Sequence, residues 1–74
     1  MKTIQFYDHG LARMHQRGIQ EEEARSIVQN PEIILPRKGK RRRLMGTIRG
    51  RRLNVVIEET DDTIWIVTSF WAEL

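Results

Sequence analysis

The chain of 74 residues contains no cysteine, two histidines and two prolines. Without cysteine it forms no disulfide and no thiolate metal site, and two histidines are too few for a zinc site built from this chain alone. No apolar run approaches the ~18 residues that a membrane-crossing helix needs, and no signal-peptide pattern opens the chain. We therefore expect no metal, no cofactor, no membrane association and a cytoplasmic location.

The length also limits the architecture. A chain of this size buries only roughly 60% of the surface that its unfolded form exposes, so a single core is all it can support. No internal repeat, low-complexity tract or long linker divides the sequence. We expect one domain spanning residues 1–74.

Charge is distributed unevenly. The net charge is +3, yet nine of the 13 lysines and arginines lie between Arg37 and Arg52, while acidic residues concentrate at 21–23 and 58–62. A basic stripe of this kind is typical of a protein with a polyanionic partner, and the alternative is a solvated hairpin that keeps the protein soluble. The residues predicted to contact nucleic acid are Arg37, Lys38, Lys40, Arg41, Arg43, Arg51 and Arg52.

Two short helices are predicted in the first half of the chain. Asp8 is a suitable N-cap for a helix of about ten residues, and Gly18 suits the position just after its end. A second helix is expected from about Gln20 to Gln29, before Pro31. Its apolar positions at helical spacing are Ala24, Ile27 and Val28. The two segments should form a helical hairpin with one apolar side.

From residue 41 onward apolar residues alternate with polar ones, which predicts three strands joined by turns at Gly50-Arg51, of type II′, and at Asp61-Asp62. The first turn predicts the pairs Ile48–Leu53, Leu44–Ile57 and Arg43–Glu58. The second predicts Ile57–Ile66, Val56–Val67 and Leu53–Phe70. Residues 2–7 either add an edge strand or simply pack against the domain.

Both registers place the same apolar residues on one face, which should receive the helices. This face carries Leu44, Ile48, Leu53, Val55, Ile57, Ile66 and Phe70. The opposite face carries Arg41, Arg43, Met45, Arg52, Val56, Glu58, Trp65, Val67 and Trp71. The predicted fold is therefore α+β, with an N-terminal helical hairpin packed on one face of a three- to four-stranded antiparallel β-meander.

The segment DHGLARMHQRG places His9, Arg13 and Arg17 four residues apart. On a helix they lie at about 0°, 40° and 80°, in one row that borders the buried stripe. Histidine can donate or accept a proton near neutral pH, and arginine binds phosphate and stabilises developing negative charge. These side chains suffice for metal-free RNA cleavage if Glu58, His15 or a lysine provides a second proton-transfer group. The simpler interpretation is that His9 bonds to nearby backbone at the start of a helix.

The segment HGLARMHQRGIQEEEARSIVQNPE resembles the opening of the domain-of-unknown-function 4258 family. The matching residues are His9, Arg13, Met14, Arg17, Gly18, Ile19 and Glu21–Glu23. The later segments GRRLNVVIEE and IWIVTSFW resemble the strand pair of that family. Two positions depart from its pattern: Gly10 replaces an alanine and Gln20 replaces a serine or threonine, and both changes should weaken helix ends.

The resemblance implies a function. The family is similar to small RelE-like toxins and to the metal-independent ribonuclease folds that include barnase, so it implies a toxin-type endoribonuclease with an antitoxin partner. His9, Arg13 and Arg17 would be its catalytic residues. In related folds RNA lies on the open sheet face. Either the row reaches around a sheet edge, or the site consists of Arg41, Arg43, Arg52 and Glu58, or the row is structural.

Two other function classes remain open at this stage. A non-catalytic module could bind nucleic acid or an acidic protein through the basic hairpin and the tryptophan face. Alternatively, a homodimeric structural or antitoxin-like protein could bury this face across a two-fold axis. The residues predicted for that dimer interface are Val56, Trp65, Val67 and Trp71.

Overall fold

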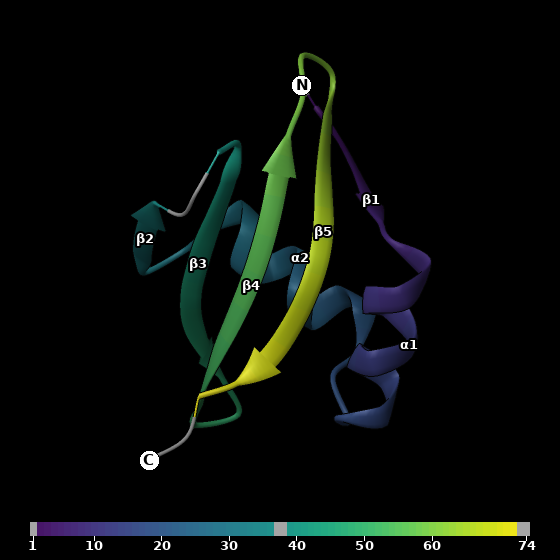
Figure 1. Cartoon of the computed structure of the whole chain (residues 1–74). Coiled ribbons are helices and arrows are strands. Elements are labelled where there is room, and N and C mark those ends of the chain that lie inside the picture. Colours follow the sequence, from purple (N-terminus) through teal and green to yellow (C-terminus); the bar gives the residue numbers. More distant parts are fainter. Residues whose placement is uncertain (1, 37–38, 73–74) are drawn as a thin grey trace.

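The computed structural model describes residues 2–36 and 39–72, which form two helices and one five-stranded sheet (Figure 1). The helices are α1 (Asp8–Gln16) and α2 (Glu21–Gln29). The strands are β1 (Thr3–Phe6), β2 (Ile33–Pro36), β3 (Arg41–Ile48), β4 (Arg51–Glu59) and β5 (Thr63–Trp71). Their order across the sheet is β1-β5-β4-β3-β2. The α+β class and the two helices are as predicted.

The sheet differs from the predicted three- to four-stranded antiparallel meander because it is mixed and has five strands. β1 is the edge strand that was one of the two alternatives for residues 2–7, whereas β2 was not predicted. β1 pairs with β5 in parallel, whereas β2–β3, β3–β4 and β4–β5 are antiparallel. Both edge strands have four residues, too short for a clear alternation of apolar and polar side chains. The helices lie between β1 and β2 in the chain and carry it from one edge of the sheet to the other, as Figure 1 shows.

The helix ends follow the prediction with one correction. Tyr7, not Asp8, is the N-cap of α1, and Asp8 is the first helical residue, where its negative charge suits the helix dipole. Gly18 adopts the left-handed conformation predicted for it, with φ of 73°. At the start of α2 the Gln20 N–H donates to Glu23 Oε1 at 2.9 Å. This bond stabilises the helix start where a serine or threonine cap is missing.

The β3–β4 turn is Arg49-Gly50 instead of Gly50-Arg51. Both residues have positive φ, 52° and 76°, as a type I′ turn requires. The register is therefore shifted by two residues from the prediction. The observed pairs include Ile48–Arg51, Leu44–Val55, Arg43–Val56 and Arg41–Glu58. A shift of two leaves each side chain on its predicted face, because successive strand side chains alternate between faces.

A β-bulge changes the second half of β5. Ile57 pairs with Ile66 as predicted, but Val67 is an extra residue, so Val56 pairs with Thr68 and Leu53 pairs with Trp71. One extra residue exchanges the faces of all the side chains beyond it. Phe70 therefore leaves the predicted helix-covered face, and Trp71 replaces it there.

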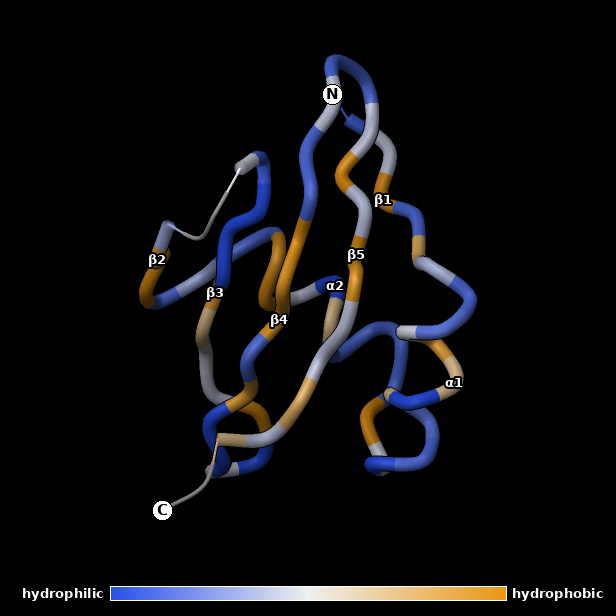
Figure 2. The backbone as a smooth tube through the Cα atoms, in the orientation of Figure 1, coloured by the Kyte–Doolittle hydropathy of each residue, from blue (hydrophilic) through white to orange (hydrophobic). Residues whose placement is uncertain are grey.

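The helices cover one face of the sheet, where α1 packs on β5 and α2 on β3 and β4 (Figure 1). The core contains Met14, Ile19, Ala24, Ile27, Leu44, Leu53, Val55, Ile57 and Ile66. In Figure 2 the apolar colour concentrates on the central part of β4 and β5, while the first half of β3 is hydrophilic. We call the other side the open face; it carries Arg41, Arg43, Met45, Asn54, Val56, Glu58, Trp65, Thr68 and Phe70.

Candidate functional site

Helix α1 lies along a free stretch of the β5 edge. β1 pairs with β5 only as far as Ile66, whose carbonyl oxygen accepts a hydrogen bond from the Tyr7 N–H at 3.0 Å. Beyond that point Gly10 is buried against the bulge, and a Cβ at this position would clash with the carbonyl oxygen of Val67. Gly10 therefore allows α1 to approach the strand backbone closely.

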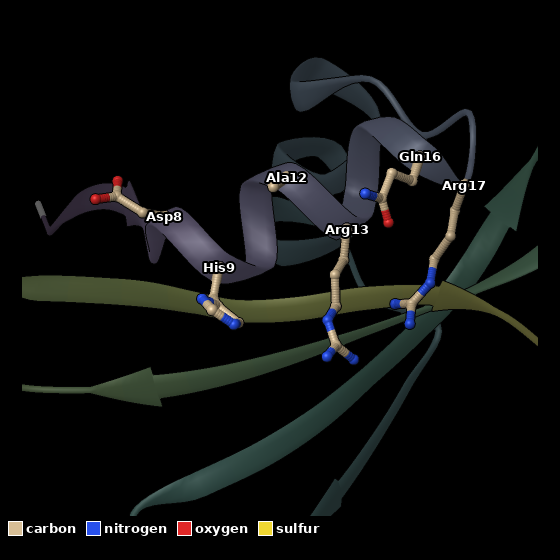
Figure 3. A pocket seen from close by; sticks show the side chains of 6 residues that line it. All are labelled: Asp8, His9, Ala12, Arg13, Gln16 and Arg17. Carbon is tan, nitrogen blue, oxygen red and sulfur yellow. The ribbon is translucent and has the colours of Figure 1, made fainter.

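The predicted row exists on α1. His9, Arg13 and Arg17 point to the same side of the helix, over β5 (Figure 3). They line a shallow, open depression together with Asp8, Ala12 and Gln16. The structure thus brings the three predicted catalytic residues together on one surface.

Arg17 fixes the position of the row relative to the sheet. Its Nη1 donates to the Ser69 carbonyl oxygen at 2.7 Å and lies 3.4 Å from Thr68 Oγ1. Its own carbonyl oxygen accepts a hydrogen bond from Trp71 Nε1 at 2.8 Å. Since Thr68 belongs to the open face, the Arg17 end of the row lies at the β5 edge beside that face. This contact is compatible with the first of the alternatives drawn from the sequence, which stays a prediction.

His9 and Arg13 are exposed, and neither side chain forms a hydrogen bond or ion pair with another described residue. His15, the other histidine, lies apart from the row. Its Nε2 is 3.9 Å from Glu21 Oε2, and it borders a different depression near the start of α2. His9 is therefore the histidine that an incoming phosphate at the row can reach.

Four arginines of the basic segment face carboxylates instead. The ion pairs are Arg41–Glu58 at 3.2 Å, Arg42–Glu59 at 3.5 Å, Arg49–Glu23 at 3.3 Å and Arg52–Glu32 at 3.9 Å. The antiparallel register and α2 bring together charges that are separate in the sequence. Much of the positive charge of this segment is therefore neutralised locally.

The other predicted nucleic-acid contacts are scattered. Arg37 and Lys38 lie outside the described residues. Lys40, Arg43 and Arg51 have no carboxylate partner within the described part of the chain, and the Arg51 guanidinium lies 4.1 Å from the centre of the Trp71 ring. Lys40 directly precedes β3, and Arg51 begins β4 opposite Ile48, so the two are about 26 Å apart along the hairpin. Arg43 lies on the open face, whereas Arg51 lies on the helix-covered face with Trp71. These basic residues are therefore divided between the two faces of the sheet.

A polar cluster occupies the open face beside the start of α1. The Tyr7 hydroxyl donates to Glu58 Oε1 at 3.1 Å, and Arg41 Nε donates to Glu58 Oε2 at 3.2 Å. The Arg41 bond and then the Tyr7 bond lower the pKa of Glu58, while the same carboxylate raises the pKa of Tyr7. Glu58 is therefore ionised at neutral pH and can accept a proton.

The four residues predicted for a dimer interface do not form a common surface. Val56 is only 2% exposed in the single chain. Trp71 lies on the helix-covered face, where it packs against the core. The bulge at Val67 is the physical reason that Trp71 lies on this face instead of the open face. Trp65 remains on the open face, with its ring centre 5.4 Å from that of Tyr7.

No group of three or more potential metal-ligating side chains occurs in the part of the chain that the structure describes. Among the same residues, no helix is both long and apolar enough to span a membrane.

The sequence alone did not identify several residues of the site. Gly10 attracted notice as a departure from alanine, but its contact with the Val67 bulge depends on the fold. Thr68 and Ser69 carry no sequence signal, because their role follows from the free edge of β5. Tyr7 could have been found as a polar aromatic residue directly before the helix that carries the row.

Comparisons with known proteins agree with the fold. The model of the domain of unknown function DUF4258 matches residues 6–71, and the chain belongs to that family. Among curated proteins, none matches the sequence. The fold is similar to that of the Brucella abortus ribonuclease toxin BrnT, with a TM-score of 0.76, 11% sequence identity and 100% coverage of both chains. At this identity the likeness shows a shared fold.

Proposed function

We propose that this chain is a toxin-type, metal-independent endoribonuclease that cleaves RNA at the row formed by His9, Arg13 and Arg17. The observation that carries the proposal is the position of the row. One imidazole and two guanidiniums share one side of α1, face around the β5 edge, and have no carboxylate partner among the described residues.

The proposed reaction needs no group beyond these side chains and one proton acceptor. The 2′-oxygen of the ribose loses its proton and attacks the phosphorus, the bond from phosphorus to the 5′-oxygen breaks, and that oxygen gains a proton. The products are a 2′,3′-cyclic phosphate and a free 5′-hydroxyl. Arg13 and Arg17 would bind the phosphate oxygens and stabilise the negative charge that develops on them.

The two proton transfers can be divided between two groups. Glu58 is ionised at neutral pH, so its carboxylate would accept the proton of the 2′-hydroxyl. Its bond to Tyr7, the N-cap of α1, places it near the His9 end of the row. His9 in its protonated form would then supply the proton to the leaving 5′-oxygen.

The comparisons support the same class of function. The structural neighbour BrnT is described as a ribonuclease toxin, and the family match covers most of this chain. If the chain is a toxin of that kind, we expect a cytoplasmic antitoxin protein to bind and inhibit it. The basic residues with no carboxylate partner, Arg43 above all, would contact the RNA backbone beside the row.

The test is a cleavage assay on mixed-sequence RNA in EDTA, with the wild-type protein beside the His9→Ala variant. We expect wild-type cleavage with 2′,3′-cyclic phosphate ends and its loss in the variant. Cleavage that persists in a His9→Ala/Arg13→Ala variant would remove the proposal. A second assay would repeat the measurement in the presence of ribosomes. If the RNA binds but stays intact in both assays, the protein is a non-catalytic binding module instead.

A further inference from the structure

The open face carries a polar side chain that the proposed reaction does not use. Asn54, in the middle of β4, is 3% exposed, and its Oδ1 is buried with no hydrogen-bond partner among the described residues. Buried amide groups are normally paired, so an unpaired one in the centre of a sheet needs an explanation. The alternation along β4 puts Asn54 on the open face, since Leu53 and Val55 on either side belong to the core.

The neighbours of Asn54 on that face suit a flat aromatic ligand. The sheet register pairs Asn54 with Phe70 on β5 and with Met45 on β3. Both neighbours are half-buried and lie outside the helix-covered core cluster. An aromatic ring beside an amide with a free acceptor is a combination that proteins use to stack a nucleobase and read its edge.

This position is next to the proposed phosphate site. Arg17 donates to the carbonyl oxygen of Ser69, the residue before Phe70, and lies 3.4 Å from the Thr68 hydroxyl on the same face as Phe70. A nucleotide whose phosphate contacts the end of the row at Arg17 would therefore carry its base toward Phe70.

We propose that Phe70 and Asn54 form a nucleobase subsite for single-stranded RNA beside Arg17. In this proposal the Phe70 ring turns outward to stack on one unpaired base, which uncovers the buried Asn54 amide. The amide then reads an edge of that base that offers a neighbouring donor and acceptor. A paired base cannot enter, because its edge is occupied and its faces are stacked. The inference rests on the proposed action on RNA, to which it adds base selection.

The experiment measures binding without cleavage. Trinucleotides of A, C, G or U with 2′-O-methyl groups have no free 2′-hydroxyl, so the wild-type protein can be titrated with them. We expect the four affinities to differ by roughly tenfold, Asn54→Leu to reduce this difference to below about threefold, and Phe70→Leu to weaken all four by about 5- to 150-fold. An RNA hairpin that carries the same sequence in its paired stem should bind with no dependence on Asn54.

Asn30→Leu is the matched control. Asn30 carries the same amide but is exposed at the C-cap of α2, which packs on the helix-covered face. Its replacement should leave base selection unchanged. If Asn54→Leu fails to fold, the side-chain amide signal of Asn54 in a wild-type NMR titration provides the same test, and the preferred trinucleotide should shift it most.

The outcomes separate this inference from the proposed function. Base selection that depends on Asn54, in a protein that does not cleave RNA, supports the subsite and removes the nuclease. Cleavage with equal affinity for all four trinucleotides, or with selection unchanged in Asn54→Leu, overturns the subsite and leaves the nuclease intact. An Asn54 amide signal that none of the trinucleotides shifts also overturns the subsite.

Discussion

Two regions of this molecule are basic, and they differ in what surrounds their charges. The segment from Arg37 to Arg52 holds most of the cationic residues, yet four of its arginines face carboxylates at 3.2–3.9 Å. The row on α1 holds only His9, Arg13 and Arg17, with no carboxylate partner among the described residues. The region with less charge in the sequence is the one in which neither arginine faces a carboxylate of the described residues.

The difference arises from register. Glu58 and Glu59 are far from Arg41 and Arg42 in the sequence, but the β3–β4 hairpin places them side by side. The α1 row escapes such pairing because it borders a free strand edge, where it meets the carbonyl oxygen of Ser69 and the hydroxyl of Thr68. The density of basic residues in a sequence therefore does not show which of them can bind a polyanion.

The largest effect should follow from removing the titratable member of the row. We expect His9→Ala to slow RNA cleavage by about 100- to 10,000-fold, the range for loss of a general acid or base. His15→Ala is the control, because His15 lies near Glu21 outside the row, and its effect should be within about threefold. Initial rates on one RNA in EDTA check both. Equal losses in the two variants would contradict the assignment.

Moving α1 away from β5 should destabilise the fold. Gly10→Ala puts a methyl group against the carbonyl oxygen of Val67, so α1 must shift away from β5. We expect the free energy of unfolding to fall by about 1–3 kcal/mol, the usual cost of overpacking. Urea denaturation measures it, with exposed Gln16→Ala as the control. A stability equal to wild type would mean that α1 is not held this close to the bulge.

Acid should weaken the Glu58 cluster. Because Tyr7 and Arg41 lower the pKa of Glu58 in the folded protein, its ionised form stabilises the fold at pH above the ordinary carboxyl value of 4.5. That contribution is lost as the pH falls through the lowered folded pKa. As the pH is lowered, the melting temperature of Glu58→Gln should therefore fall less than that of the wild type. Glu22→Gln is the control and should behave like the wild type. Parallel curves for wild type and Glu58→Gln would refute this.

The smallest effect should come from the hairpin ion pairs. Arg42 lies 3.5 Å from Glu59, and its side chain is 58% exposed. Exposed pairs of this kind contribute about 0–1 kcal/mol, so Arg42→Gln should change the free energy of unfolding by less than about 1 kcal/mol. A larger loss in urea denaturation would show that the neutralised hairpin is a structural requirement of the fold.

The sequence predicted the helices well because their apolar spacing and terminal residues are local signals. Ala24 and Ile27 are buried as expected, and Gly18 ends α1. The row on α1 was predictable for the same reason. Of the two edge strands, β1 was predicted only as one of two alternatives and β2 was not predicted, because four residues are too few to show a clear alternation.

The errors in the sheet have particular causes. The β3–β4 register was wrong because Arg49, a non-glycine residue, adopts positive φ in the turn. The positions of Phe70 and Trp71 were exchanged because no local pattern marks the bulge at Val67. Asn54 was not singled out as a site residue, since its burial depends on neighbours from β3 and β5.

The comparison between the two basic regions is tested most directly by the salt dependence of RNA binding. The slope of log affinity against log salt concentration reports the number of phosphates neutralised. We expect Arg13→Gln/Arg17→Gln to reduce the magnitude of that slope by about 1.5, and Arg42→Gln/Arg52→Gln to leave it nearly unchanged. The reverse result, an unchanged slope in the α1 variant and a reduced one in the hairpin variant, would contradict the account.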